Sequence, residues 1–417
     1  MLFLYRILIN TVFLFSPIIV IYRLLKKKES FERFKEKFCF FSKKRGNGKL
    51  VWFHGASVGE LQSIVPLLEK FEKNKSIDKV LITSNTLSSS KVLKKLKLKK
   101  IVHQFFPIDT NFYSKKFIKY WNPSSAFFID SEIWPNMYFN LKKKGIPIIL
   151  LNGRITTKSF LRWKLFQNFS KKIFETFSLC LSSSIESKRY LEKLGAINIK
   201  FIGNLKFSQS ENEKLEINQK LKKNILSRKA WCASSTHQNE EQFCGLVHLK
   251  LKKKFKDLLT IIIPRHIDRA DFIEKELSKL NLKIYRHESE KKMNKDTDVY
   301  IVDAYGKTKT FYSFCKNVFL GGSLVNHGGQ NPLEATRYGC NILHGPYTSN
   351  FKEIYNFLKK NNISKKINNE QDMMKYLIKL FSKKSNSKKI QDKLNKIGKK
   401  ILENTYKDLK YVLKNEI

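Results

Sequence analysis

Short apolar runs alternate with longer amphipathic stretches along most of this chain. The first series of runs lies at Leu50–Phe53, Val80–Thr83, Ile101–Phe106, Ala126–Ile129, Ile146–Leu151 and Leu179–Leu181. A second series lies at Leu258–Ile263, Val299–Val302, Val318–Leu320 and Ile342–Leu343. Continuous apolar runs of this length are typical of strands buried on both faces, and the stretches between them are long enough for helices. The pattern predicts an α/β protein with two Rossmann-like, doubly wound domains.

A polar, charged passage separates the two series and is the predicted linker, residues 208–223. It divides an amino-terminal domain, residues 29–207, from a carboxy-terminal domain, residues 224–387. Residues 388–417 show a lysine-rich helical pattern without a strand and are predicted to form a helical tail. Ligands of doubly wound domains bind at the carboxyl ends of strands. We therefore expect the two domains to face each other across a cleft lined by such strand ends.

The first residues, 1–28, are predicted to form an uncleaved membrane anchor. The segment is strongly apolar up to Leu25, and three lysines follow it, which favours a cytoplasmic location for the rest of the chain. Its uninterrupted apolar part is a little shorter than the ~20 residues that cross a bilayer. The anchor therefore either spans the membrane or lies in its interface, and a buried helix of the first domain is the alternative. Phenylalanines at helical spacing in residues 31–38 predict a further contact with lipid.

The charge of the chain is extreme, at a formal +45 from 81 Lys+Arg against 36 Asp+Glu. Nucleic-acid binding, attraction to an anionic membrane surface and compositional bias are three explanations. The lysines are dispersed and arginines are few, whereas a surface that reads bases favours arginine. We therefore interpret the charge as compositional bias together with a cationic face, which an anionic membrane surface could attract, and we expect no nucleic acid as a partner. The six cysteines include no CxxC pair and are predicted to be buried free thiols in a reducing cytosol.

A glycine-rich segment, Gly321–Glu334, follows the predicted strand 318–320 and precedes a predicted helix that opens at Pro332. Its glycines let the backbone approach a ligand closely. The start of the helix predicts a seat for phosphate, because free N–H groups and the helix dipole meet there. Asn331 and Glu334 could bind sugar hydroxyls. A purely structural turn is the alternative explanation of the same pattern.

Polar residues follow four predicted strand ends of the first domain. Glu60 opens a helix after the first strand, and a carboxylate there could act as a general base; a carboxylate that only complements the helix dipole is the alternative. Glu132, Arg154 and Lys206 follow later strands. Ser57 and His54 are too close in sequence for a plausible catalytic triad with each other, so the pattern does not predict a hydrolase.

The second domain offers further groups for a phosphate. Residues 233–237 carry small and hydroxyl side chains, and Arg265 follows a predicted strand that ends at Pro264. A capped turn and a surface arginine are the alternatives. The one Asp-x-Asp triplet, residues 296–298, precedes a strand and is predicted to be a solvated turn. We therefore expect neither a metal ion nor a cofactor.

Taken together and in order, the motifs of this chain resemble those of the 3-deoxy-D-manno-octulosonic acid (Kdo) transferases of Gram-negative bacteria. The motifs are WFHGASVGE from Trp52, SEIWPN from Ser131, NGR from Asn152, GNLKF from Gly203, ASSTH from Ala233, PRH from Pro264, GGSLVNHGGQNPLE from Gly321 and HGPYTSNF from His344. They extend over nearly the whole chain.

The resemblance implies a GT-B glycosyltransferase that transfers Kdo from CMP-Kdo to a lipid A precursor, with inversion, at the cytoplasmic face of the inner membrane. It implies that Glu60 is the general base and that Glu132 and Lys206 support the transition state. Ser57 and Arg154 are expected to contact the acceptor or an anion. The implied nucleotide-binding residues are Pro264, Arg265, Tyr305, Gly306, Lys307, Gly322, Ser323, Asn331, Pro332, Leu333 and Glu334.

Two departures from the family pattern leave alternatives open. Tyr305, Gly306 and Lys307 stand where the family usually has Met-Gly-Glu, and Gln330 stands where histidine is commoner. A GT-B enzyme with another nucleotide-sugar donor, or a non-catalytic cationic protein that binds membranes, would fit the same fold. The motifs do not determine the number of Kdo residues transferred or the acyl pattern of the acceptor.

Overall fold

The computed structural model describes residues 1–96, 98–209, 218–287, 293–383 and 385–414. The chain forms two compact units: unit 1 comprises Met1–Gln209 with Ile397–Ile417, and unit 2 comprises Ser210–Lys396. Most of the predicted linker, residues 210–217, lies outside the described residues, and helix α9 already begins at Gln219. The domain boundaries drawn from the sequence stay predictions.

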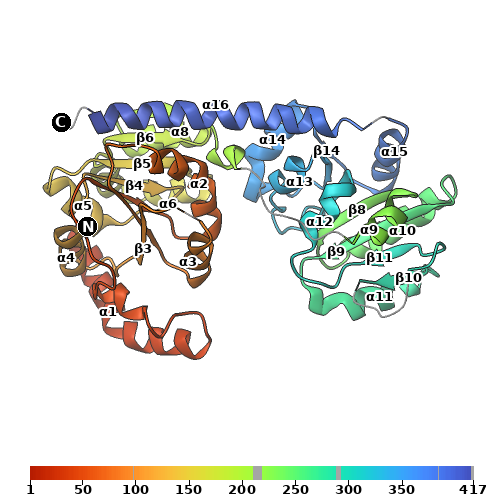
Figure 1. Cartoon of the computed structure of the whole chain (residues 1–417), viewed down its shortest axis with the longest axis horizontal. Coiled ribbons are helices and arrows are strands. Elements are labelled where there is room, and N and C mark those ends of the chain that lie inside the picture. Colours follow the sequence, from red (N-terminus) through yellow and green to blue (C-terminus); the bar gives the residue numbers. More distant parts are fainter. Residues whose placement is uncertain (97, 210–217, 288–292, 384, 415–417) are drawn as a thin grey trace. The chain divides into compact units, whose positions relative to one another are not determined.

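Unit 1 is built on a parallel sheet with the strand order β3-β2-β1-β4-β5-β6-β7 among the described residues (Figure 1). The strands are β1 (Leu50–His54), β2 (Lys79–Ser84), β3 (Ile101–Phe105), β4 (Ser125–Ile129), β5 (Ile148–Gly153), β6 (Leu179–Ser182) and β7 (Ile199–Phe201). All residues of β1, β4, β5 and β6 are buried. The order reverses beside β1, which pairs with β2 on one side and β4 on the other.

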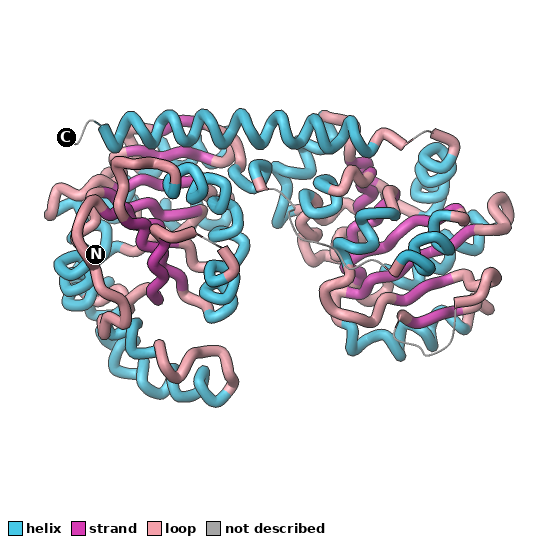
Figure 2. The backbone as a smooth tube through the Cα atoms, in the orientation of Figure 1, coloured by secondary structure: helices cyan, strands magenta, loops and turns pink. Residues whose placement is uncertain are grey.

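Helices cover both faces of this sheet, as the cyan and magenta tube of Figure 2 shows. The helices of this unit are α1 (Leu2–Leu25), α2 (Val58–Glu72), α3 (Leu87–Lys94), α4 (Asn111–Trp121), α5 (Pro135–Lys143), α6 (Thr157–Lys164), α7 (Gln167–Phe174) and α8 (Ile185–Leu194), with the short helices η1 (Phe34–Phe38) and η2 (Leu205–Ser208). Large aromatic side chains fill the core, among them Trp52, Phe117 and Trp121, none of them more than 2% exposed.

Unit 2 repeats the design with the strand order β10-β11-β9-β8-β12-β13-β14 in its described part. Its strands are β8 (Lys229–Thr236), β9 (Leu258–Pro264), β10 (Ile284–Arg286), β11 (Val299–Ile301), β12 (Asn317–Leu320), β13 (Asn341–His344) and β14 (Ser364–Lys366). β8 pairs with β9 and β12, so the first strand of this unit also lies where the order reverses. Ligands of doubly wound folds bind at such switch points, at the carboxyl ends of the strands.

The helices of unit 2 are α9 (Gln219–Leu226), α10 (Glu240–Lys252), α11 (Ala270–Ser278), α12 (Thr308–Phe314), α13 (Leu333–Arg337), α14 (Lys352–Lys360) and α15 (Glu370–Phe381), with η3 (Ile267–Arg269) and η4 (Ser349–Phe351). The carboxy-terminal helix α16 (Ser387–Lys414) contributes residues to both units. Two parallel, doubly wound sheets confirm the predicted α/β fold class.

Every strand predicted from an apolar run is present. Four further strands in the structure were not predicted, because their sequences do not form apolar runs. β7, β10 and β14 are three-residue edge strands that include lysine or arginine, a usual feature of sheet edges. The central strand β8 reads KAWCASST, and its small hydroxyl and alanine side chains do not form an apolar run. Its residues from Trp231 to Ser234 are nevertheless buried.

Helix α1 is the one candidate among the described helices that is long and apolar enough to cross a membrane. Its most apolar window has a mean hydropathy of 2.0, and only 11% of that window is buried inside the protein. The basic-aromatic segment after it forms a short 3₁₀ helix, η1, and the lipid contact predicted for residues 31–38 stays a prediction. Phe31 in this segment is exposed, whereas Phe38 packs against Phe13 of α1.

Two smaller predictions have different outcomes. The solvated turn predicted at residues 296–298 is wrong for Asp298, which is buried and accepts hydrogen bonds from His248 and from the backbone N–H of Lys283. An adjacent lysine, Lys252, pairs with the same carboxylate. All six cysteines are buried free thiols, as predicted.

Candidate active site

The carboxyl edge of the unit 1 sheet gathers three carboxyl groups and a lysine around the end of β1. Glu60 lies in the first turn of α2, where Ser57 is the N-cap. The Glu60 carboxylate accepts a hydrogen bond of 2.7 Å from the backbone N–H of Ala56 and another of 2.7 Å from the Ser57 hydroxyl. The Ser57 hydroxyl in turn accepts from the backbone N–H of Glu60 at 3.4 Å. The arrangement resembles a capping box, with Ala56 donating in place of the N-cap residue, and it fixes the carboxyl group relative to the strand end.

The acid–base properties of Glu60 differ from those of an ordinary surface glutamate. Burial raises its pKa to about 7, and the nearby charges of Glu132 and Asp130 add to the rise. The hydrogen bonds from Ser57 and Ala56 oppose it. The side chain is only partly buried. A carboxyl group with this pKa exchanges protons near neutral pH, which suits a general base and is more than helix capping requires.

Glu132 lies three residues beyond β4 and is held by a chain of buried polar groups. Its carboxylate accepts a 3.0 Å hydrogen bond from the Trp134 indole and lies 3.3 Å from Nε2 of His54. The other ring nitrogen of His54 lies 2.9 Å from the Thr83 hydroxyl. Burial lowers the pKa of His54, so the ring is neutral at pH 7. A neutral ring can accept from Thr83 and donate to Glu132, which orients the carboxylate.

Lys206 and Arg154 belong to the same edge of the sheet. The Lys206 ammonium lies 3.5 Å from the Asp130 carboxylate, and the backbone N–H of Arg154 donates to the Asp130 carbonyl at 3.1 Å. Asn152 at the end of β5 accepts a hydrogen bond from the N–H of Leu205, which fixes the turn that carries Lys206. The structure therefore brings Glu60, Glu132 and Lys206, together with Asp130, to the carboxyl ends of the strands of the unit 1 sheet.

The corresponding edge of unit 2 is organised by a carboxylate that the sequence did not single out. Glu240, the first residue of α10, accepts hydrogen bonds from the backbone N–H groups of Gly322, Ser323 and Leu324 at 2.7, 3.1 and 2.9 Å. It also accepts one of 2.9 Å from the N–H of His237. These four bonds fix the glycine-rich segment against the end of β8.

The helix predicted to bind phosphate at its amino-terminal end is shorter than expected. Helix α13 has only five residues, Pro332 is its N-cap, and the N–H of Leu333 already donates to the Asn331 side chain. The Ser323 side chain is buried and accepts a hydrogen bond from the N–H of Gly345. In this conformation the hydroxyl of Ser323 serves the loop itself, so a ligand would meet other groups of the segment.

A cationic and aromatic cluster lies beside this segment. The rings of His237 and His327 are stacked with centroids 4.2 Å apart, and Gln330 lies 3.3 Å from His237 Nε2. Burial lowers the pKa of His237 to about 4, and the charges of His327, His266, Arg269 and Arg265 lower it further. Arg265 is exposed directly after β9. The concentration of positive groups at this edge suits an anionic ligand.

The loop of Tyr305, Gly306 and Lys307 follows β11 at the same carboxyl edge. Tyr305 is 76% exposed, and Gly306 adopts a φ of +76° with no atom within 4 Å of the position a Cβ would take. Lys307 is the N-cap of α12 and makes no side-chain cap hydrogen bond. The exposed conformation leaves room for a ligand to contact the loop, while Glu334, at the start of α13, is half-buried.

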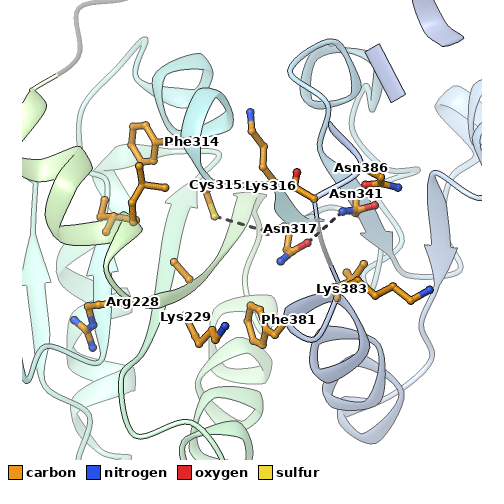
Figure 3. A pocket seen from close by; sticks show the side chains of 15 residues that line it. Arg228, Lys229, Phe314, Cys315, Lys316, Asn317, Asn341, Phe381, Lys383 and Asn386 are labelled. Carbon is orange, nitrogen blue, oxygen red and sulfur yellow. Dashed lines mark hydrogen bonds between the residues drawn. The ribbon is translucent and has the colours of Figure 1, made fainter. Parts of the chain in front are cut away.

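The pocket drawn in Figure 3 lies at the amino ends of the strands of unit 2, opposite the carboxyl ends that form the candidate site. It has a volume of about 390 Å³ and is lined by the first residues of β8, β12 and β13, which are Lys229, Asn317 and Asn341. Doubly wound folds bind their ligands at the carboxyl ends of strands, so this pocket at the amino ends is not part of the candidate site.

Comparison with known proteins gives consistent results. A family model described as "3-Deoxy-D-manno-octulosonic-acid transferase (kdotransferase)" matches residues 32–209. The chain is 35% identical to the 3-deoxy-D-manno-octulosonic acid transferase of Rickettsia bellii over 350 residues, which cover 82% of each chain. It is 36% identical to that of Rickettsia prowazekii over 80% of this chain and 72% of the relative. The chain belongs to the Kdo transferase family. It is therefore a glycosyltransferase.

Solved structures agree with this assignment at the level of the fold. The UDP-GlcNAc 2-epimerase of Neisseria meningitidis, 14% identical, covers 87% of this chain and 100% of its own with a TM-score of 0.58. The family assignment confirms the resemblance found in the sequence. The roles of individual site residues, and the absence of a metal ion, stay predictions.

Three groups of the site were not predicted to act there from the sequence: His54, Asp130 and Glu240. His54 and Asp130 lie inside the motifs that carry the resemblance, but their partners, Glu132 and Lys206, are 78 and 76 positions away. Glu240 lies beyond the ASSTH motif, and three of its four partners are more than 80 positions away. A glutamate at a helix start directly after a strand was the available signal, the same signal that singled out Glu60.

Proposed function

We propose that this enzyme transfers Kdo from CMP-Kdo to a hydroxyl group of a lipid A precursor, with inversion at the anomeric carbon. The observation that carries the proposal is the Glu60 carboxyl group. It lies partly exposed at a switch-point strand, its pKa is raised to about 7, and a lysine–carboxylate pair lies at the same edge. It also falls within residues 32–209, which match the family model.

In the proposed reaction Glu60 removes the proton of the acceptor hydroxyl as its oxygen attacks the anomeric carbon of Kdo. The bond between that carbon and the phosphate oxygen breaks, and CMP leaves with the bonding electron pair. A base with a pKa near 7 is half ionised at neutral pH and still basic enough to accept the proton. Glu132 is held by Trp134 and His54 and would orient the acceptor.

The negative charge of the leaving phosphate and of the Kdo carboxylate requires cationic partners. Lys206 is the candidate in unit 1, where Asp130 holds its ammonium group in place. Arg265, which is exposed directly after β9, is the candidate in unit 2. The segment that Glu240 fixes, with Asn331 and Glu334 at its end, would bind the cytidine and ribose.

The proposed location is the cytoplasmic face of the bacterial inner membrane. The lipid acceptor would be a phosphorylated, acylated glucosamine disaccharide, which is anionic. The +45 charge of the chain favours an anionic surface, at about 1 kcal/mol for each lysine or arginine near the lipid. The apolar helix α1 would supply the anchor.

Replacement of the proposed base tests the mechanism. For Glu60→Gln we expect transfer to fall by about 10²–10⁴-fold, because the amide cannot accept the proton. Purified full-length enzyme, CMP-Kdo and the lipid precursor would be combined and the product measured by mass spectrometry. Glu69→Gln, an exposed position of the same helix, is the matched control. A Glu60→Gln enzyme with unchanged turnover would remove Glu60 from the mechanism.

A thermal-shift series with CMP and UMP tests the donor separately. Stabilisation by CMP in both the wild-type enzyme and Glu60→Gln, and much less by UMP, would support a cytidine donor. Preferential stabilisation by UMP would instead favour a glycosyltransferase with a UDP-sugar. This readout does not depend on the chemical step, so donor and base are judged independently.

A further inference from the structure

Helix α10 begins with two buried glutamates at the place where doubly wound folds usually bind a diphosphate. It follows β8, the first strand of unit 2, at which the strand order of the sheet reverses. In such folds the pyrophosphate of a dinucleotide lies at the start of the helix after the first strand, against free backbone N–H groups. Here Glu240 and Glu241 are the first two residues of that helix, and they are 1% and 4% exposed. Two negative side chains therefore lie where a diphosphate would be expected.

The Glu240 carboxylate is surrounded by backbone donors. Its Oε2 atom accepts from the N–H groups of Gly322 and His237 at 2.7 and 2.9 Å. Its Oε1 atom accepts from those of Ser323 and Leu324 at 3.1 and 2.9 Å. We call these four N–H groups the anion nest, because neighbouring backbone N–H groups that converge on one anion are a common phosphate-binding arrangement in proteins. In this structure the anion in the nest is a side chain of the protein itself.

The hydrogen bonds indicate that Glu240 is ionised. A carboxylate offers about four lone-pair positions, and because each oxygen accepts two bonds, all of these positions are used. A proton on either oxygen would point at an N–H donor. Burial raises the pKa of Glu240, and the bonds from the four N–H groups oppose this rise. The anion nest is therefore filled by a charged group, and its N–H groups are already paired before any ligand binds.

Glycine at two positions allows the segment to approach Glu240 this closely. A Cβ on Gly321 would lie 2.7 Å from Oε2 of Glu240. Gly322 has a φ of +64°, and a Cβ there would lie 3.1 Å from the His237 ring. His237 is half-buried, and its ring stacks on that of the exposed His327. The anion nest therefore adjoins the cationic and aromatic cluster of the candidate site.

We propose that Glu240 makes unit 2 selective for donors with a single phosphate between nucleoside and sugar, because its carboxylate occupies the anion nest that a second phosphate would need. The inference rests on the proposed function, in which the donor is a nucleoside monophosphate sugar. Arg265 would bind that one phosphate. A nucleoside diphosphate would bring its second phosphate towards N–H groups that are already paired and towards a carboxylate that repels it. Glu240 thus determines specificity and takes no part in the chemical step.

The affinities of CMP and CDP for the full-length enzyme test the proposal. Dissociation constants are measured by isothermal titration calorimetry for the wild type, Glu240→Ala and Glu241→Ala. We expect the wild type to bind CDP roughly tenfold more weakly than CMP. In Glu240→Ala the four N–H groups are released, and CDP should bind at least as tightly as CMP, because hydrogen bonds to a charged group change affinity by about tenfold or more.

Glu241→Ala is the matched control. It removes an equally charged, buried carboxylate from the next position of the helix, but this carboxylate pairs with the Arg269 guanidinium, at 2.9 and 3.2 Å. The control therefore measures how far the loss of any negative charge favours the more anionic nucleotide. We expect it to keep the wild-type ratio of the two affinities. Equal ratios in Glu240→Ala and Glu241→Ala would overturn the proposal, and so would a wild type that binds CDP as tightly as CMP.

An anion-rescue measurement covers a Glu240→Ala protein that is too unstable for calorimetry. The substitution empties the anion nest, so inorganic phosphate or acetate should bind there and stabilise the folded state. The melting temperature of Glu240→Ala should therefore rise with either anion, at an ionic strength held constant with chloride. It should rise much less in the wild type and in Glu241→Ala. A rise of the same size in all three proteins would mean that the nest does not accept an external anion and would overturn the proposal.

Failure of the proposed donor gives a different result from failure of this inference. If the donor is not a cytidine nucleotide, the wild type binds CMP no better than UMP. The effect of Glu240→Ala is then measured with UMP and UDP, and the same reversal of the ratio is expected. If the wild type prefers CMP but Glu240→Ala leaves the ratio of CMP to CDP affinity unchanged, the proposed function stands and the role of Glu240 in specificity is wrong.

Discussion

The two units place a glutamate at equivalent points of their folds and use it in opposite ways. Glu60 follows β1 and Glu240 follows β8, and each of these strands lies where the strand order of its sheet reverses. Each glutamate opens a helix and approaches the loop after the neighbouring strand, β4 in unit 1 and β12 in unit 2. The loop after β4 presents Asp130 and Glu132, whereas the loop after β12 presents three backbone N–H groups.

The neighbouring loop therefore decides what the carboxyl group does. Burial raises the pKa of Glu60 to about 7, and the negative charges of Glu132 and Asp130 add to the rise. The two hydrogen bonds that the carboxylate accepts from Ala56 and Ser57 oppose it only in part. Glu240 is 1% exposed and accepts four backbone hydrogen bonds, an arrangement that fixes a loop. The same topology thus supplies a proton acceptor in one unit and a structural brace in the other.

The largest effect after that of Glu60→Gln is expected from Lys206→Gln, which removes the cation at the unit 1 edge. We expect turnover to fall by about 10²–10³-fold, because a charge that stabilises the leaving group in a water-poor site is lost. Lys200→Gln, which removes a half-exposed lysine of the edge strand β7, is the control and should be nearly neutral. Steady-state rates at saturating CMP-Kdo provide the measurement. Equal activities of the two variants would contradict the role of Lys206.

Replacement of Glu240 tests whether this glutamate, unlike Glu60, contributes to the stability of the folded protein. Glu240→Gln should lower the free energy of unfolding by about 2 kcal/mol, because the buried N–H groups of residues 322–324 lose a charged acceptor. Chemical denaturation and amide hydrogen exchange of this loop would be measured. Glu276→Gln, at a surface ion pair, is the control. Unchanged hydrogen exchange at Gly322 and Ser323 would contradict the bracing role, and a comparable loss of stability in Glu60→Gln would remove the contrast.

The pH dependence of the reaction sharpens the contrast further. Glu60 must be ionised to accept a proton, and burial raises its pKa to about 7. The value of kcat/KM should therefore fall about tenfold for each unit below pH 7 and reach a plateau above it. The measurement requires a pH range in which thermal unfolding shows the enzyme to be folded. A rate that stays constant from pH 7 to pH 5.5 would contradict a base with this pKa.

The smallest effect is expected from Asp130→Asn. Loss of this negative charge removes one of the neighbours that raise the pKa of Glu60, so the midpoint of the pH profile should move down by roughly 0.5 units. Asp392→Asn, an exposed position of helix α16, is the control and should leave the midpoint unchanged. A shift to higher pH in Asp130→Asn would mean that the charge of Asp130 does not raise the pKa of Glu60.

Local sequence patterns determined the fold class and much of the site's position. Apolar runs such as Ala126–Ile129 and Leu258–Ile263 predict buried parallel strands, because a strand covered on both faces cannot alternate with polar residues. Polar residues directly after such runs, among them Glu60 and Arg265, could be placed at strand ends for the same reason. The short edge strands and β8 were not predicted, because basic residues at the sheet edges and small buried residues do not form an apolar run.

What the tertiary structure alone decided is the set of partners of each polar group. The pairing of Lys206 with Asp130, the hydrogen bonds of Glu240 to the glycine-rich segment and the bond of Tyr5 in α1 to Asp109 join residues that are distant in sequence. A pKa, an occupied N–H group and the orientation of an apolar helix all depend on such neighbours. The hydrophobic pattern of a sequence indicates which residues are buried. It carries no information about which distant residue each of them contacts.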